Sequence, residues 1–346
     1  MNLSIRPFEG ADSDYETVVG IGNACEPEYP GTVEEVRGRD ARRPEKIRWA
    51  RYIAEFDGRP VAVSGYGNSL WHYDSHRFDI EISVLPEERR RGIGGRLFDH
   101  LLRELEPLEP AVLKAWTRDD RSDDGRFVLK RGFEEVGRDW ESRGKLSNFD
   151  PRAWDSGEAR LRTDGIEIVD LRSLMDRFSD WDRRLHDLQM EVHHDIPSIS
   201  PATDVPFDTW RSDFLDSPSR RPEATFIALH GDRFVAVSEL CKPQVGEHLD
   251  TSITGVRRAY RRKGLALALK LRALTWAKEQ GYPEIRTWNS QRNEGMLSIN
   301  VRLGFEKQPA WIEYALSLTG KQWAPGRDAD AGGSKLLGRP QISNEP

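Results

Sequence analysis

The stretch ERRRGIGGRL, from Glu88 to Leu97, places three arginines beside three glycines at the predicted start of a helix. A related stretch, RRKGLA, begins at Arg261, 172 residues after Arg89, and has the same Arg-x-x-Gly-x-Gly/Ala pattern. Short motifs of this kind often arise by chance. Two copies in one chain raise the question of whether the whole chain is a repeat.

Other marks recur at nearly the same offset. Val61–Ser64 (VAVS) recurs as Val235–Ser238, 174 residues later, each time after a turn made of Gly and Asp. Gly132–Phe133 recurs as Gly304–Phe305, at an offset of 172 residues. Self-similarity at a fixed spacing is the sequence signature of a repeated structural unit. The sequence therefore predicts two copies of one domain.

Each copy predicts the same order of elements: a first strand, helices, a hairpin, a strand that enters the Arg/Gly stretch, a long helix, a strand, a short helix and a last strand. The hairpins are expected at 51–66 and 224–240, and the strands that enter the Arg/Gly stretches at 78–84 and 249–256. Apolar residues four apart predict one buried stripe on each long helix. They are Ile93, Leu97, Leu101 and Leu105 in the first copy and Leu265, Leu269, Ala273 and Ala277 in the second. The pattern predicts an α/β fold, with a mixed α+β sheet in each copy.

The domain boundaries are expected at turn and breaker residues. The first domain spans 1–150, and a linker at 151–162 follows the turn NFDP at 148–151. The second domain spans 163–319. Residues 320–346 are rich in Gly, Pro and charge with little periodicity, which predicts a disordered tail.

The composition is that of a globular protein. The 346 residues are 37 % hydrophobic, enough for two cores, and 52 basic residues are scattered among 58 acidic ones, without the basic stripe that nucleic-acid binding requires. Cys25 and Cys241 lack the spacing of metal ligands or of a disulfide framework, which indicates a reducing compartment. The start is polar and no apolar run is long enough to span a bilayer. We therefore expect a cytoplasmic protein with neither nucleic acid nor membrane as a partner.

The Arg/Gly stretches are candidate anion sites. A strand that turns directly into a helix leaves the first N–H groups of the helix without partners, and the helix dipole adds partial positive charge there. Glycines let a phosphate approach these amides, and arginines add charge-assisted hydrogen bonds. The alternative is a solvated basic helix start, which two copies in register make less favoured.

The order of strand, Arg-x-x-Gly-x-Gly/Ala, helix, strand, short helix and Gly-Phe resembles the GNAT superfamily of acyl-CoA N-acyltransferases. The duplicated chain resembles the tandem branch of that superfamily, which includes the mycothiol synthases, over residues 3–145 and 164–318. The resemblance implies two tandem GNAT-like domains and acetyl-CoA as co-substrate. It also implies that the loop holds the coenzyme A pyrophosphate, while the pantetheine arm lies between two splayed strands.

The resemblance also implies a set of cofactor-binding residues. Val84 and Val256 match the end of the strand whose backbone receives the thioester. The full set is Val84, Arg89, Arg91, Gly92, Ile93 and Gly94 in the first copy, and Val256, Arg261, Arg262, Lys263, Gly264, Leu265, Ala266 and Asn293 in the second.

The copies differ where the family carries two further residues. Asn293 matches an asparagine that commonly hydrogen-bonds the cofactor arm, and Arg121 takes its place in the first copy. The tyrosine that often acts as general acid toward the thiolate is replaced by Asn300 in the second copy and by Val128 in the first; only the asparagine can donate a hydrogen bond. The chemistry is therefore expected in the second copy, and the first is expected to be non-catalytic or cofactor-holding. Asn293 is equally well explained as a helix N-cap.

Acetyl transfer to an amine requires a base for the ammonium and a donor for the oxyanion. A backbone N–H near Val256 is the candidate donor. The candidate bases are Glu239, at the end of one central strand, and His248 and Asp250, at the start of the next, although each is also explained as a surface group. The predicted catalytic residues are thus Glu239, Asp250 and Asn300.

The acceptor side gives a weaker signal. The stretch 187–216 has seven acidic residues and one basic residue, Arg211, which favours a cationic small-molecule amine; a solvated acidic loop is the alternative. His193 and His194 are adjacent, with no further ligand at a useful spacing, so no metal is expected.

The leading hypothesis is an N-acetyltransferase that moves an acetyl group from acetyl-CoA to a primary amine of a small molecule by direct attack on the thioester. Two alternatives stay open. One is a non-catalytic acyl-CoA-binding regulatory protein, because both copies lack the tyrosine, and the other is a transferase of the same fold for a larger acyl group. The sequence gives no oligomeric state.

Overall fold

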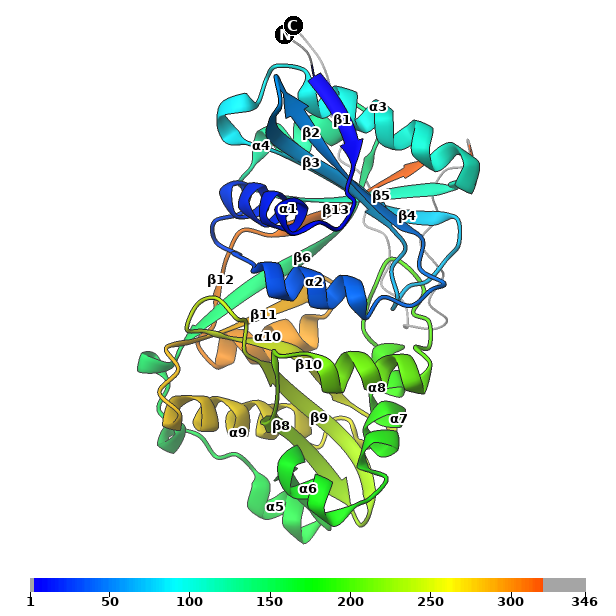
Figure 1. Ribbon diagram of the computed structural model, residues 1–346. Coiled ribbons are helices and arrows are strands. Elements are labelled where there is room, and N and C mark those ends of the chain that lie inside the picture. The colour runs from blue at the N-terminus through cyan, green and yellow to red at the C-terminus, as the bar shows by residue number, and fades with distance from the viewer. Residues whose placement is uncertain (1–2, 320–346) are drawn as a thin grey trace, which may run out of the picture.

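The computed structural model describes residues 3–319 and consists of two halves with the same order of elements (Figure 1). The first half contains β1 (Leu3–Pro7), α1 (Asp12–Cys25), α2 (Val33–Ala41), β2 (Trp49–Phe56), β3 (Arg59–Gly67), β4 (Arg77–Val84), α3 (Ile93–Leu105), β5 (Val112–Arg118), α4 (Ser122–Leu129) and β6 (Glu134–Lys145).

The second half starts with α5 (Glu158–Thr163), in the segment predicted to be a linker. It continues with β7 (Ile166–Asp170), α6 (Leu171–Arg177), α7 (Trp181–His193), α8 (Phe207–Asp216), β8 (Arg220–His230), β9 (Arg233–Cys241), β10 (Leu249–Val256), α9 (Leu265–Glu279), β11 (Glu284–Ser290), α10 (Glu294–Arg302), β12 (Glu306–Lys307) and β13 (Trp311–Ser317). The predicted α/β fold with a mixed sheet is confirmed. The tail predicted to be disordered lies outside the described residues.

All thirteen described strands belong to one sheet. The order is β1-β2-β3-β4-β5-β13-β6-β11-β10-β9-β8-β7, and β12 pairs with β6 outside this path. Two neighbouring pairs are parallel, β4 with β5 and β10 with β11, and the other pairs are antiparallel. The sheet is therefore mixed, with one parallel pair in each half.

The two halves exchange their last strands. β13, from the second half, pairs with β5 of the first half, and β6, from the first half, pairs with β11 of the second. β6 and β13 also pair with each other at the centre of the sheet. The division of the sequence at 150 and 163 therefore does not divide the sheet, because each half completes the sheet of the other.

Helices cover both faces of the sheet. In the second half, Leu249 and Ile285 pack in one core with residues of α9, whereas Val237 and Ile253 pack in another with residues of α6, α7 and α8. In the first half, Phe98 of α3 packs with residues of β4, β5 and β13 in a corresponding core. We call the side of the sheet that α9 covers the α9 face, and the side that α6, α7 and α8 cover the α7 face. No helix among residues 3–319 is long and apolar enough to cross a membrane.

Each half also extends a loop onto the other. Between β3 and β4, the carbonyl oxygen of Trp71 accepts a hydrogen bond from the backbone N–H of Thr203, at 2.9 Å. Between β9 and β10, the backbone N–H of Gln244 donates to the carboxylate of Glu35 in α2, at 2.9 Å. The halves are thus joined by the sheet and by both loops.

Candidate active site

The loop between β10 and α9 has the backbone of an anion site. Arg262 and Gly264 are left-handed, with φ of 63° and 86°. Gly264 is the N-cap of α9 and no side chain caps the helix, so the first amides of α9 are open to a ligand. Arg262 and Lys263, just before these amides, are exposed. This arrangement suits a phosphate.

The first half repeats this loop. The φ values are 65° at Arg90 and 82° at Gly92, and α3 also starts without a side-chain cap. The carboxylate of Glu88 pairs with the guanidinium groups of Arg59 and Arg91, which places the charge of Arg91 beside an acid. The backbone of the two loops is therefore alike, while their charges differ.

The leading arginine of each loop bonds to its own strand. Nε of Arg261 donates to the carbonyl oxygen of Val256, and Nε of Arg89 donates to that of Val84, each at 3.1 Å. Arg261 also pairs with Asp195. These arginines, which the sequence assigns to phosphate, therefore fix the path of the loop from strand to helix.

A gap opens in the sheet beside the second loop. β10 and β11 pair only at Leu249–Asp250 with Ile285–Arg286. β10 then has a β-bulge between Thr251 and Ile253, which bends a strand and increases its twist. The equivalent pairing of β3 with β4 is regular. The bulge thus distinguishes the gap of the second half.

A cavity of about 230 Å³ occupies this gap. Because side chains alternate along a strand, residues in phase with Leu249 and Ile285 point to the α9 face. Here the cavity is lined by polar side chains of β10, β11 and the adjoining helices, namely Thr251, Thr254, Thr287, Asn289, Asn293 and Lys270. The amide of Asn293 caps α10, since its Oδ1 accepts from the backbone N–H of Met296 at 3.3 Å.

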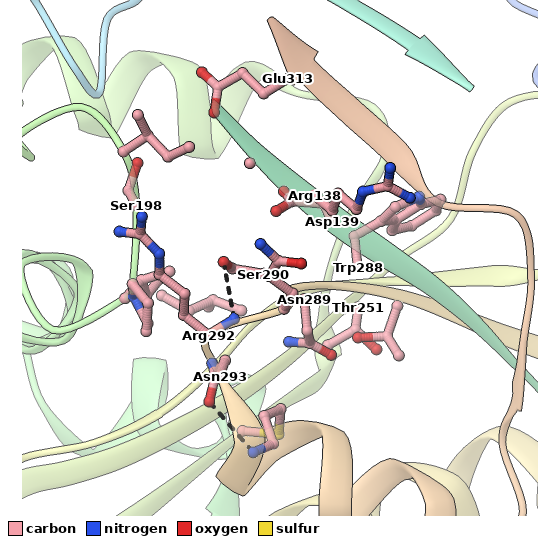
Figure 2. Close-up of a pocket in the computed structure, with 18 of the residues that line it drawn as sticks. Arg138, Asp139, Ser198, Thr251, Trp288, Asn289, Ser290, Arg292, Asn293 and Glu313 are labelled. Atoms are coloured by element: carbon pink, nitrogen blue, oxygen red, sulfur yellow. Dashed lines mark hydrogen bonds between the residues drawn. The ribbon is translucent and has the colours of Figure 1, made fainter. Parts of the chain in front are cut away.

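The cavity continues to the α7 face, where residues of both halves line it. They are His72 and Lys114 of the first half, Asp139 of β6, residues 196–199 of the second half, and Glu313 of β13. Figure 2 shows Asp139 and Asn289 on neighbouring strands, with Ser198 of the covering loop opposite. A Cβ at Gly137 would lie 2.3 Å from Cδ1 of Ile199, so glycine is needed where this loop covers β6.

Asp139 is the carboxylate of this cavity that has no partner. It makes no hydrogen bond or ion pair with another described side chain, whereas Glu313 forms an ion pair with Nζ of Lys114 at 2.5 Å. Burial, and then the charge of Glu313, raise the pKa of Asp139 to about 6. Asp139 is therefore a carboxylate that gains and releases a proton near neutral pH. It enters the site of the second half because β6 is exchanged.

Lys270 is the buried cation of this cavity that has no ion-pair partner among the described residues. Its side chain projects from α9 and is 4 % exposed, and its Nζ lies 5.4 Å from the ring centre of Phe305. No acidic group among residues 3–319 pairs with it. Burial alone lowers the pKa of Lys270 to about 8.

The predicted bases lie away from this cavity. Glu239 is fully buried between β9 and α7, where it pairs with Arg220 and accepts from Nε2 of Gln189 at 3.2 Å. Asp250 lies at the start of β10, 3.6 Å from His248, and burial raises its pKa to about 6. Neither carboxylate lines the cavity.

Asn300 is placed behind the cavity wall. Its Nδ2 donates to Oδ1 of Asn289 at 2.7 Å, and Asn289 lines the cavity. The Oδ1 of Asn300 is buried without a hydrogen-bond partner. Asn300 therefore reaches the gap through Asn289.

The acidic stretch 187–216, which runs from α7 through α8, is mostly neutralised by ion pairs. Among its residues, the ones that line the cavity are 196–199, none of which is acidic. Five of its seven acids pair with basic side chains outside the cavity: Asp187 and Glu191 with Arg257, Asp195 with Arg258 and Arg261, Asp204 with His194, and Asp213 with Arg42. The acids that face this cavity are instead Asp139 and Glu313, and the expectation that the stretch attracts a cationic amine stays a prediction.

The first half fills the corresponding gap with apolar side chains. Register with β3 and β9 places Ile80 and Ile82 where the second half has Thr251 and Thr254. The 172-residue offset likewise places Ala115 at the position of Thr287 and Phe98 at that of Lys270. All four pack in the first-half core. The polar gap therefore belongs to the second half.

The position of Asn293 is also changed in the first half. There Arg121 donates to the carbonyl oxygen of Cys25 at 3.1 Å and pairs with Glu26 and Glu28. Its side chain is thus held by α1 and the segment that follows. Within residues 3–319, no group of three or more His, Cys, Asp or Glu is arranged to hold a metal ion.

Sequence reasoning missed Asp139 and Lys270. Lys270 leaves a signal, since it replaces a phenylalanine of the other copy in an apolar helix face. Asp139 leaves none, because its position in the second-half site depends on the strand exchange.

Comparison with known proteins identifies the family. An acetyltransferase (GNAT) domain model matches residues 48–135, and an acetyltransferase (GNAT) family model matches residues 183–305. A mycothiol acetyltransferase of Catenulispora acidiphila is 24 % identical over 241 residues, which cover 68 % of this chain and 71 % of that protein.

Two solved structures have a similar fold along most of the chain. One is a tandem GNAT protein from the clavulanic acid biosynthesis pathway, with a TM-score of 0.71 and 16 % identity, which covers 91 % of this chain and 98 % of that one. The other is a GCN5-related N-acetyltransferase from Sphaerobacter thermophilus, with a TM-score of 0.64 and 17 % identity, over 91 % and 95 % of the two chains. The protein belongs to the GNAT family of N-acetyltransferases and carries two domains of that family in tandem.

Proposed function

We propose that the second half binds acetyl-CoA and transfers its acetyl group to the primary amine of a small molecule. The observation that carries the proposal is the cavity through the β10–β11 gap, which runs from Lys270 of α9, the helix that follows the anion loop, to Asp139 on the α7 face. A thioester brought in from one face then meets an amine brought in from the other.

The residues of the second half suit acetyl-CoA. The uncapped amides of α9 and the exposed Arg262 and Lys263 suit the pyrophosphate. The amide and hydroxyl groups that line the gap suit an arm that contains two amide groups. Asn293 faces this gap while it caps α10, so the two roles considered for it are compatible. The first half has a similar loop but an apolar gap, so we infer one acetyl-CoA site per chain.

Asp139 is the group we assign as general base. An acceptor amine enters as an ammonium ion, which the carboxylates of Asp139 and Glu313 attract. Asp139 removes the proton, the amine nitrogen attacks the thioester carbon, and a backbone N–H near Val256 stabilises the oxyanion. The carbon–sulfur bond then breaks and coenzyme A leaves as a thiolate. Glu239 and Asp250 stay weaker candidates, because neither faces the cavity.

The test is release of free coenzyme A thiol from acetyl-CoA in the presence of a library of small primary amines. Wild type is expected to turn over with a rate that rises with pH through about 6, where Asp139 loses its proton. Asp139→Asn is expected to lose about 10²-fold or more in kcat, and its rate should no longer rise with pH through about 6. Glu135→Gln, on the same strand but paired with Arg138, is the matched control.

The outcomes separate the alternatives. Binding of acetyl-CoA without turnover of any amine would favour the non-catalytic reading. Faster turnover with longer acyl-CoA thioesters than with acetyl-CoA would favour a transferase of a larger acyl group. If the turnover rate of Asp139→Asn still falls as the pH drops below about 6, as in wild type, Asp139 is refuted as the base.

A further inference from the structure

Lys270 is a buried charge that no acidic side chain among residues 3–319 neutralises. It lies on α9, five residues after the start of the helix, and its side chain lines the cavity among Thr287 and Asn289. Three other cations line the same cavity. Lys114 and Arg138 are paired with carboxylates, and Arg292 is exposed. An ammonium group is expensive to bury without a partner, so its partner is expected to come with a ligand.

The second copy departs from the first at this position. The residue at the same place in α3 is Phe98, which packs against Phe133 with ring centres 6.1 Å apart. The side chain of Lys270 contacts Phe305, the counterpart of Phe133, with its Nζ 5.4 Å from the ring centre. The fold therefore accepts an apolar side chain here, and the charge is not needed for packing. The lysine occurs in the half that has the polar gap.

The direction of the proposed reaction places an anion beside Lys270. In the proposed reaction the amine attacks from the α7 face, where Asp139 lies, and the cofactor arm enters the gap from the α9 face, so the leaving sulfur stays on the side of α9. Lys270 is the buried cation that lines the cavity there. The sulfur becomes negative when the carbon–sulfur bond breaks.

We propose that Lys270 is a catalytic residue whose ammonium group binds the coenzyme A thiolate as it leaves. This inference rests on the proposed function. As the nitrogen–carbon bond forms and the carbon–sulfur bond breaks, the electron pair of the latter passes to sulfur, and the resulting thiolate forms an ion pair with the Nζ ammonium. Lys270 keeps its proton throughout, and the thiolate takes a proton from solvent after coenzyme A leaves the site. A thiolate near an ammonium group is favoured, so the thiol of bound coenzyme A has a lowered pKa.

The experiment follows this thiol and does not require the acceptor amine. Reduced coenzyme A is bound to the full chain, and the ultraviolet absorbance of the thiolate is titrated with pH. We expect the thiol pKa to fall by about one unit or more on binding to wild type, a tenfold change in the thiolate-to-thiol ratio. In Lys270→Met and Lys270→Phe the pKa should return to that of free coenzyme A, with binding kept through the phosphate loop.

Lys263→Met is the matched control, because it removes a cation from the exposed loop. It should weaken binding and leave the bound thiol pKa low. If coenzyme A binds to wild type with an unshifted thiol pKa, the inference is overturned and the proposed function stands. This measurement uses wild type alone, so it does not depend on the folding of any variant. Failure of wild type to bind coenzyme A would overturn both. Tighter binding of succinyl-CoA than of acetyl-CoA, lost in Lys270→Met, would assign the ammonium to an acyl carboxylate and also overturn the inference.

Discussion

Replacement of Lys270 by methionine should make the free protein more stable at neutral pH. Burial lowers the pKa of Lys270 from its ordinary value of 10.5 to about 8. Below pH 8 the lysine is protonated in both the folded and the unfolded chain, so the folded state carries the whole desolvation penalty. A difference of about 2.5 units corresponds to about 3 kcal/mol. Methionine has a similar length and no charge, so the variant should gain stability of that order.

The sign of the pH dependence follows from the same shift. Between pH 8 and 10.5 the folded chain loses the proton before the unfolded chain does, so the penalty on wild type fades and its free energy of unfolding rises relative to the variant. Urea unfolding of both proteins, without coenzyme A, at about pH 7 and about pH 10 measures this. The advantage of Lys270→Met should fall from about 3 kcal/mol to less than about 1 kcal/mol.

Lys130→Met, at an exposed position after α4, is the control and should change stability by less than about 0.5 kcal/mol at either pH. A Lys270→Met protein that is less stable than wild type near pH 7 would refute the reasoning. So would an advantage of equal size at both pH values, since that would come from packing rather than from charge.

Two further predictions concern the structure around the site. Arg220→Met leaves Glu239 as a buried carboxylate without its ion-pair partner and should lower the free energy of unfolding by about 3–5 kcal/mol. The double variant Arg220→Met, Glu239→Leu should recover most of this loss. Equal stability of the single and double variants in urea unfolding would contradict the pairing. Because β6 and β13 are exchanged between the halves, residues 1–150 and 151–346 expressed separately should each fail to unfold cooperatively. Co-expression of the two pieces should restore one cooperative transition. A cooperative transition in either isolated half would show that the exchange is dispensable.

The repeat was predictable because its marks are local. The offset between Arg89 and Arg261 places two loops of the same kind, and in both the glycine before the helix has positive φ, which a short sequence pattern can encode. The strand that enters each loop and the helix that leaves it follow from hydrophobic periodicity. The presence of a last strand in each half follows as well.

The partners of those last strands were not predictable. Strands such as β6 and β13 have the same alternation whichever half they join, and packing of the whole chain decides between the two pairings. Asp139 reaches the second-half cavity for this reason. The pairing of the acids of the stretch 187–216 was not predictable for the same reason, because ion pairs such as that of Arg261 with Asp195 depend on how the loops pack together.

The most direct test of a single acetyl-CoA site in the second half is isothermal titration of acetyl-CoA into wild type, Gly264→Trp and Gly92→Trp. The two glycines are matched, since both are N-caps with positive φ, and tryptophan at either should block its own loop. We expect one bound equivalent for wild type, loss of binding in Gly264→Trp and unchanged binding in Gly92→Trp. Two equivalents in wild type, or loss of binding in Gly92→Trp alone, would contradict the assignment of the site to the second half.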